Sequence, residues 1–274
     1  MPKPLSILDL VSKYLSESYD DLVNNKGNAA QPLEEAASTV HVGPLRQLLD
    51  SLATVVMDYY EGSKYLDADV ERVNVWFNSA FGGECIVGEP NKDAIAACIL
   101  KVRDGIKERY AEDGYCIYEK DADPGAIEAC KAANKAFGKI KDWGGVNRIA
   151  YAFGDTVVVS AWRGEVAGIS VSVGKSIDRA VIHVYGDVSG GLRNTAEVIA
   201  NAIGLNVDEC KYDELETVEV GYLECPLNGA KPKEAAVVGA AAMHALLTED
   251  WGELEEEGAK RLELERFSEL ASSG

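Results

Sequence analysis

The chain has 274 residues, 47% of them apolar, and its 46 acidic and 27 basic residues give a net charge of −19. This length supports one large or two ordinary domains with a core that needs no metal or disulfide. So acidic a surface repels phosphate backbones and anionic lipids, which excludes a general nucleic-acid or membrane-surface binder. The sequence has neither an apolar run of about 18 residues nor a secretion signal. We therefore expect a soluble, cytoplasmic protein.

Helical periodicity dominates the first half of the chain. Apolar residues recur at helical spacing over residues 5–23, 44–60 and 93–108, and residues 24–32 have the composition of a loop. Asn91 is a suitable N-cap and Pro44 suits a first helical turn. The segment Val70–Phe81 fits a helix equally well as a strand.

A short strand at Tyr115–Tyr118 and a helix at Pro124–Phe137 follow. Asp123 precedes this helix as an N-cap, and proline is favoured in a first turn. Gly144 and Gly145 then mark a change from helical to strand-like periodicity.

Four runs rich in β-branched residues come after these glycines, separated by short turns that contain glycine or aspartate. They cover Arg148–Phe153, Thr156–Trp162, Val166–Val173 and Ala180–Tyr185. Short turns join strands as hairpins, so the pattern predicts an antiparallel meander. A helix at Asn194–Ile203 and a fifth strand at Thr217–Glu224 are expected next.

The run Ala235–Leu247 is apolar on all sides except for His244, which is typical of a helix buried in a core or a subunit interface. The tail Glu249–Leu270 has the pattern of an acidic amphipathic helix. The predicted fold class is therefore α+β, with a helical N-terminal half and then the order ββββαβαα. The predicted domains are 1–142, 143–248 and the C-terminal helix in 249–274.

Six cysteines occur without any C-x-x-C pair, and the chain has only three histidines. Metal sites normally cluster such ligands, so we expect no metal site, and the cysteines are interpreted as small buried side chains. The sequence indicates no cofactor. Only two glutamines and three methionines are present, a scarcity compatible with a hot habitat.

The segment Val181–Ala196 has the pattern of a strand, a glycine-rich loop and a helix start. We expect Gly190 and Gly191 to bring backbone amides close to an anion, with Arg193 adding a charge. Asn194 or Thr195 would add a side-chain donor. The alternative is an ordinary turn in which Asn194 caps the helix.

Lys231 precedes the apolar helix, where a lysine opposes the helix dipole. It is predicted to bind an anion, with a solvated surface lysine as the alternative. His183 and Asp187 are a candidate acid–base pair or ordinary structural residues. No pattern identifies catalytic residues, so whether the protein is an enzyme is left open.

The sequence favours binding of a small phosphate- or carboxylate-bearing ligand by the C-terminal α+β half, as enzyme or sensor. The alternative is a non-catalytic oligomeric subunit or protein-interaction module. In that alternative, the helix at 235–247 and the acidic tail form the contacts, in a homo-oligomer or with another protein.

Overall fold

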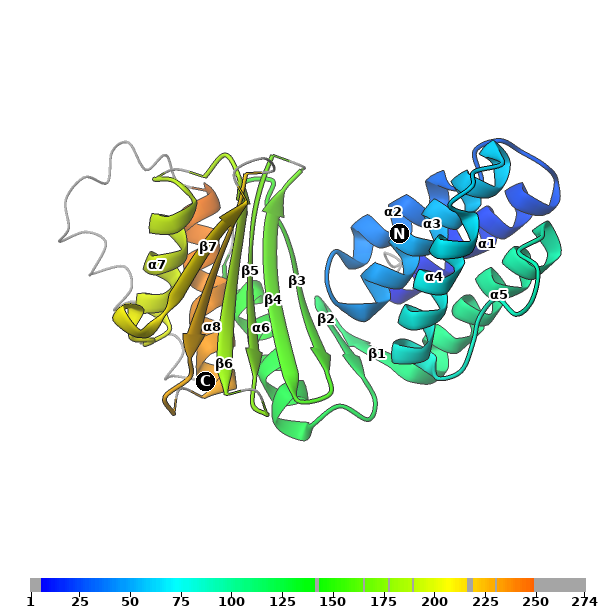
Figure 1. Cartoon of the computed structure of the whole chain (residues 1–274). Helices are drawn as coiled ribbons and strands as arrows, with labels where there is room; N and C mark the ends of the chain where they lie inside the picture. The colour runs from blue at the N-terminus through cyan, green and yellow to red at the C-terminus, as the bar shows by residue number, and fades with distance from the viewer. Residues whose placement is uncertain are drawn as a thin grey trace. The chain divides into compact units, whose positions relative to one another are not determined.

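The computed structural model describes residues 6–140, 143–164, 166–176, 178–188, 190–215, 219–229 and 231–248. The chain divides into two compact units, 1–112 and 113–274. Helices make up the first unit and a mostly antiparallel sheet with helices makes up the second, which confirms the predicted α+β class (Figure 1). In the ranges above, no helix is both long and apolar enough to cross a membrane.

The first unit is a helical bundle in which α1 contacts α2 and α5, and α3 contacts α2 and α4. Its helices are α1 (Ile7–Val23), α2 (Gln31–Val40), α3 (Gly43–Glu61), α4 (Leu66–Phe81) and α5 (Lys92–Arg109). The side chains of Ser6 and Asn91 cap α1 and α5 by accepting a backbone N–H.

Two local features of the bundle differ from expectation or settle an ambiguity. The loop predicted over residues 24–32 is too long, because α2 begins at Gln31 with Pro32 in its first turn. The ambiguous segment Val70–Phe81 is part of α4. Val73 and Phe77 are buried on one side of this helix, whereas Val75, which a strand would place with them, is 64% exposed.

The second unit is built on the strand order β2-β3-β4-β5-β6-β8-β7. Its elements are β2 (Cys116–Glu119), α6 (Pro124–Lys139), β3 (Asn147–Phe153), β4 (Thr156–Arg163), β5 (Ala167–Gly174), β6 (Arg179–Gly186), α7 (Leu192–Ala202), the 3-10 helix η1 (Val207–Glu209), β7 (Lys211–Leu215), β8 (Val220–Pro226) and α8 (Pro232–Thr248). The strand β1 (Tyr110–Asp113) contains the division between the units. Strands β3 to β6 form the predicted antiparallel meander.

Three details of this unit were not predicted. β2 pairs with β3 in parallel through the crossover helix α6, which places both strands in one compact unit; the domains 1–142 and 143–248 stay a prediction. A further strand, β7, pairs with β8. The strand expected at Thr217–Glu224 corresponds to β8 from Val220 onward; Thr217, Val218 and the helix expected in 249–274 lie outside the described residues.

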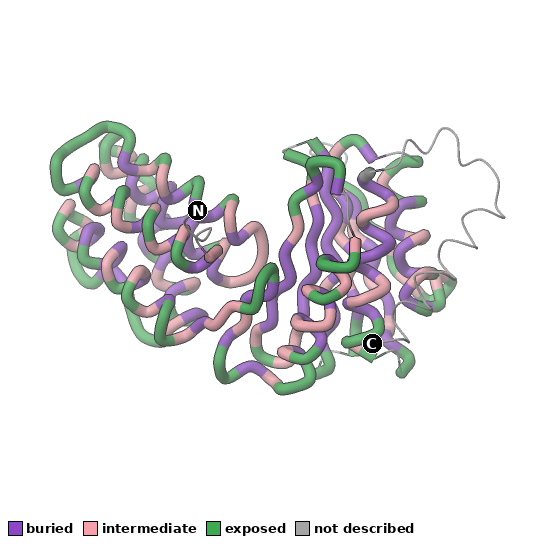
Figure 2. Tube along the Cα trace, turned by 180° about the vertical axis from the view of Figure 1, so that it is seen from behind, coloured by how far each residue is buried: buried purple, intermediate pink, exposed green. Residues whose placement is uncertain are grey.

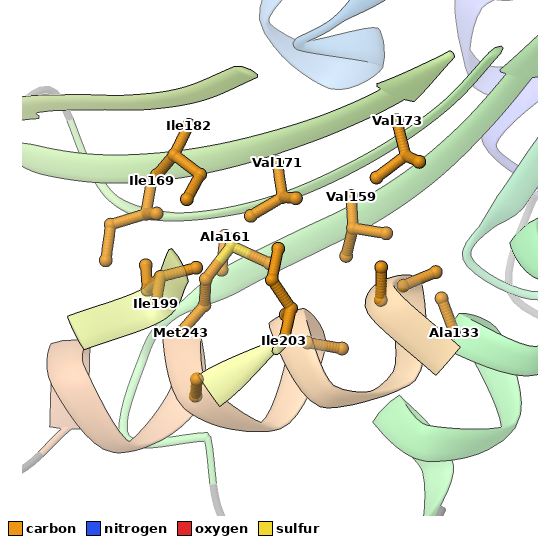
Figure 3. Packing of buried hydrophobic residues seen from close by; sticks show 14 of the residues in the cluster. Ala133, Val159, Ala161, Ile169, Val171, Val173, Ile182, Ile199, Ile203 and Met243 are labelled. Carbon is orange, nitrogen blue, oxygen red and sulfur yellow. The ribbon is translucent and has the colours of Figure 1, made fainter. Parts of the chain in front are cut away.

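One face of the sheet is covered by α6, α7 and α8 (Figure 1). Alternate strand residues such as Val159, Val171 and Ile182 point from this face toward Met243 of α8 and Ile203 beyond α7 (Figure 3). The buried stretches run along the middle strands, as Figure 2 shows by colour. The core of the unit therefore lies between the sheet and these three helices.

The apolar helix predicted at 235–247 is α8, and it packs on α6, α7, β4 and β5. Ala240 and Met243 are fully buried. Gly239 faces the sheet, because a Cβ there would lie 3.6 Å from the Val171 side chain, an ordinary van der Waals distance. Packing within one chain thus accounts for the apolar sequence, and self-association through this helix stays a prediction.

The six cysteines form three disulfides, a pairing that was not predicted, whereas the predicted burial holds for all of them but Cys210. The pairs are Cys85–Cys98, Cys116–Cys130 and Cys210–Cys225. Each pair closes a loop of 13 to 15 residues, and two of the three lie in the sheet unit. The spacing between the two cysteines of each pair, which is wide in sequence, is the length of chain that connects one structural element to the neighbour on which it packs.

Candidate functional site

The predicted glycine loop leads into α7, and its glycines have positive φ angles, which glycine adopts readily. Gly190 and Gly191 have φ angles of +91° and +82°, and Gly191 is the N-cap of α7 without a side-chain cap. Arg193 lies in the first turn, but its Nε donates to Glu197 Oε1 at 2.8 Å. This bond and the carboxylate charge raise the pKa of Arg193 further. The guanidinium is therefore already paired with a carboxylate of its own helix.

The other predicted ligand-binding residues are more dispersed. Asn194 lies close to Gly190, since a Cβ on that glycine would be 2.9 Å from the Asn194 amide nitrogen. Thr195 is buried. Lys231 lies before α8, where its Nζ is 3.3 Å from Glu234. Residues 190–195 lie together because they are consecutive in the chain, whereas Lys231 precedes a different helix, α8. Anion binding at this loop stays a prediction.

A larger candidate site is the groove between α6 and α8, a cavity of about 620 Å³. Its floor is formed by small and branched apolar side chains: Ile127, Ala132, Ala136, Ile140, Val237 and Ala241. Its polar residues are Lys131, Lys135, Lys139, Lys233, Glu128 and Asp113. We call this the α6–α8 groove, and it lies wholly within the sheet unit.

The groove is locally basic in a strongly acidic chain. Four lysines and two carboxylates line it, a sum of +2, whereas the chain carries −19. Lys233 donates to Glu128 at 2.8 Å, and this bond is the main reason that the pKa of Glu128 lies below its ordinary value. The charge of Lys135 lowers that pKa as well. Lys233 and Lys135 therefore both act on the charge of Glu128.

The lysines are placed by the helix period. Lys131, Lys135 and Lys139 follow one another at intervals of four residues, so α6 presents them on one side. The Lys131 ammonium lies 4.9 Å from the centre of the Tyr118 ring on β2. This spacing is readable in the sequence, but lysines at helical intervals are usually solvated surface residues, so the spacing alone does not indicate a site.

Comparison with known proteins gives no information on function, so the proposal below depends on the chemistry of the site. No protein-family model matches this chain. Neither a curated protein nor a solved structure matches it significantly.

A second polar region lies on the sheet face opposite the three helices. His183 of β6 lies directly across from Ser170 of β5 and Tyr222 of β8. The His183 and Tyr222 rings are stacked with centroids 4.7 Å apart, and Ser170 is 3.0 Å from Ser160. This face is therefore polar and aromatic at its centre.

His183 Nε2 is buried and has no hydrogen-bond partner within the part of the chain that the structure describes. Burial lowers the pKa of His183, so its ring is neutral at pH 7. Asp187, its proposed acid–base partner, follows β6, where its backbone N–H donates to the Val166 carbonyl. Stacking on Tyr222 instead orients the His183 ring, and an acid–base role for the pair stays a prediction.

Proposed function

We propose that the sheet unit binds a small amphipathic anion, with an apolar body and a carboxylate or phosphate head, in the α6–α8 groove. The observation that carries the proposal is the basic groove with an apolar floor in a chain of charge −19. The proposed ligand is a small anion, as expected from the sequence. Its principal contacts are expected at the lysines of α6 and not at the loop before α7.

The size and chemistry of the groove support such a ligand. Small-molecule sites usually measure about 300–1,000 Å³ and combine apolar walls with a few charged groups. Ile127, Ala136 and Val237 offer the apolar contact, and Lys131 and Lys135 offer charge-assisted hydrogen bonds. Apolar contacts and charge-assisted hydrogen bonds are reversible, so we propose binding or sensing as the role of this groove.

The test compares dodecanoate with dodecanol in calorimetric titrations of the full chain. Dodecanoate is expected to bind, and Lys131→Gln/Lys135→Gln is expected to weaken it at least tenfold, about 1.4 kcal/mol. The matched control is Lys175→Gln/Lys211→Gln, which makes the same charge change at exposed positions of the same unit away from the groove. It is expected to leave the affinity unchanged.

Two results would contradict the proposal. Equal affinities for dodecanoate and dodecanol would show that the lysines contribute nothing to recognition. Failure of dodecanoate and dodecyl phosphate to bind at low ionic strength, both to the unaltered chain and to a variant with Glu255, Glu256 and Glu257 changed to Gln, would remove the groove as an anion site.

The cytoplasmic location expected from the sequence is kept as part of this proposal, together with a hot habitat. Disulfides normally belong to oxidising compartments, but intracellular proteins of hyperthermophiles are disulfide-rich. Three disulfides and a scarcity of glutamine and methionine fit that exception.

A further inference from the structure

The end of α8 lies near one end of the α6–α8 groove. Near the start of both helices, Lys233 of α8 contacts Glu128 of α6 at 2.8 Å. Past the end of α6, the Trp143 ring lies 4.8 Å from the ring of His244 on α8. The two helices therefore run in the same direction. The chain leaves α8 beside the part of the groove lined by Lys139 and Ile140.

Residues 249–274, which follow α8, have the chemistry that complements this groove. They include nine acidic and three basic residues, a sum of −6. The large apolar residues interspersed among them are Trp251, Leu254, Leu262, Leu264, Phe267 and Leu270. An acidic segment that also carries apolar side chains complements a groove lined by lysines and apolar residues.

Residues 249–274 are also long enough to lie along the groove. The part of α6 that lines the groove, 124–140, rises about 24 Å at 1.5 Å per residue. The last lining residue of α8, Ala241, is seven residues before its end, about 10 Å away. Twenty-six residues extend about 39 Å even as a helix, enough to reverse direction and return along the whole groove.

We propose that residues 249–274 occupy the α6–α8 groove of their own chain and compete with the anionic ligand, so that the tail inhibits ligand binding. Covalent linkage favours this occupant, because a short connection gives the segment an effective concentration in the millimolar range. The inference rests on the groove of the proposed function, but its test separates the two.

Lysine acetylation followed by mass spectrometry measures the occupancy directly in the full chain. In the variant Glu255→Gln/Glu256→Gln/Glu257→Gln, Lys131 and Lys135 are expected to react several-fold faster than in the unaltered protein. Lys13 in the helical unit is the internal reference and is expected to react equally in both. The matched control Glu34→Gln/Glu35→Gln/Glu71→Gln changes the net charge equally at exposed positions and is expected to leave the groove lysines protected.

Dodecanoate titration provides the second measurement, with about tenfold tighter binding expected in the Glu255–Glu257 variant. Equal acetylation rates in variant and unaltered protein would overturn the inference. Protection that increases with protein concentration would also overturn it, in favour of the tail of a second copy. If no ligand binds to either protein while the acetylation rates differ, the proposed function and the competition fail, and occupancy of the groove by the tail stands.

Discussion

The double substitution Cys116→Ala/Cys130→Ala is expected to lower the free energy of unfolding of the sheet unit by about 3 kcal/mol. The disulfide joins β2 to α6 across 14 positions of sequence. Closing a loop of about 15 residues removes about 10 cal/mol/K of entropy from the unfolded chain, or about 3 kcal/mol at 25 °C. Both side chains are fully buried, so alanine at each position keeps an apolar contact.

Differential scanning calorimetry of the full chain measures this change. For a unit of this size, about 3 kcal/mol corresponds to a fall in Tm of about 6–12 °C. The matched variant Cys85→Ala/Cys98→Ala opens a loop of similar span in the helical unit. It is expected to lower the transition of that unit instead. The two variants together assign the transitions, because each opens a disulfide in only one unit.

The reasoning would be refuted by a simple chemical result. Six titratable thiols in protein unfolded without reductant would show that the three pairs do not form. Unchanged transitions in both double variants, with the disulfides present in the unaltered protein, would show that loop closure contributes no stability here.

Two further predictions concern single positions. Burial, then a hydrogen bond with Asp58, raises the pKa of Asp69, so the folded state holds a proton that the unfolded state releases. Stability should therefore fall as pH rises from the ordinary pKa of aspartate, about 3.9, through the raised value. Asp69→Asn should raise the Tm of the helical unit at pH 7 but not below pH 3, with exposed Asp67→Asn as the control in pH-dependent melting experiments. Gly186→Ala should lower the free energy of unfolding, measured by denaturant titration, by about 3 kcal/mol or more, because the new Cβ would collide with a backbone carbonyl and the residue has a positive φ. At Gly154 only the positive φ opposes an alanine, so Gly154→Ala should lower it by about 1 kcal/mol.

Elements with strong periodicity were predicted well because local sequence and tertiary packing agree. The β3 to β6 meander matches its predicted boundaries to within two residues, since each strand has β-branched residues and each turn has glycine or aspartate. The α4 segment was ambiguous because Val73, Val75 and Phe77 alternate as in a strand. Only the exposure of Val75 in the folded unit resolves it.

Features that depend on contacts distant in sequence were missed. β7 is an edge strand with mostly charged, exposed residues, so it lacks the apolar alternation by which strands are recognised. The parallel β2–β3 pair depends on how α6 crosses the sheet, which no local pattern encodes. The groove likewise needs α6 and α8 side by side. Its lysine spacing was visible, but its apolar floor comes from two segments about a hundred residues apart.

The parallel pairing of β2 with β3 determines where a recombinant fragment of the sheet unit must start. A fragment that begins at Trp143 lacks β2, so the N–H and C=O groups on that side of β3 lose their partners. β7, the natural edge, has the charged residues Asp213 and Glu214, whereas the centre of β3 is uncharged and buried. Unpaired edges of this kind recruit other chains into intermolecular sheets. A fragment starting at Trp143 is therefore expected to aggregate, and one starting at or before Asp113 keeps β3 as an interior strand.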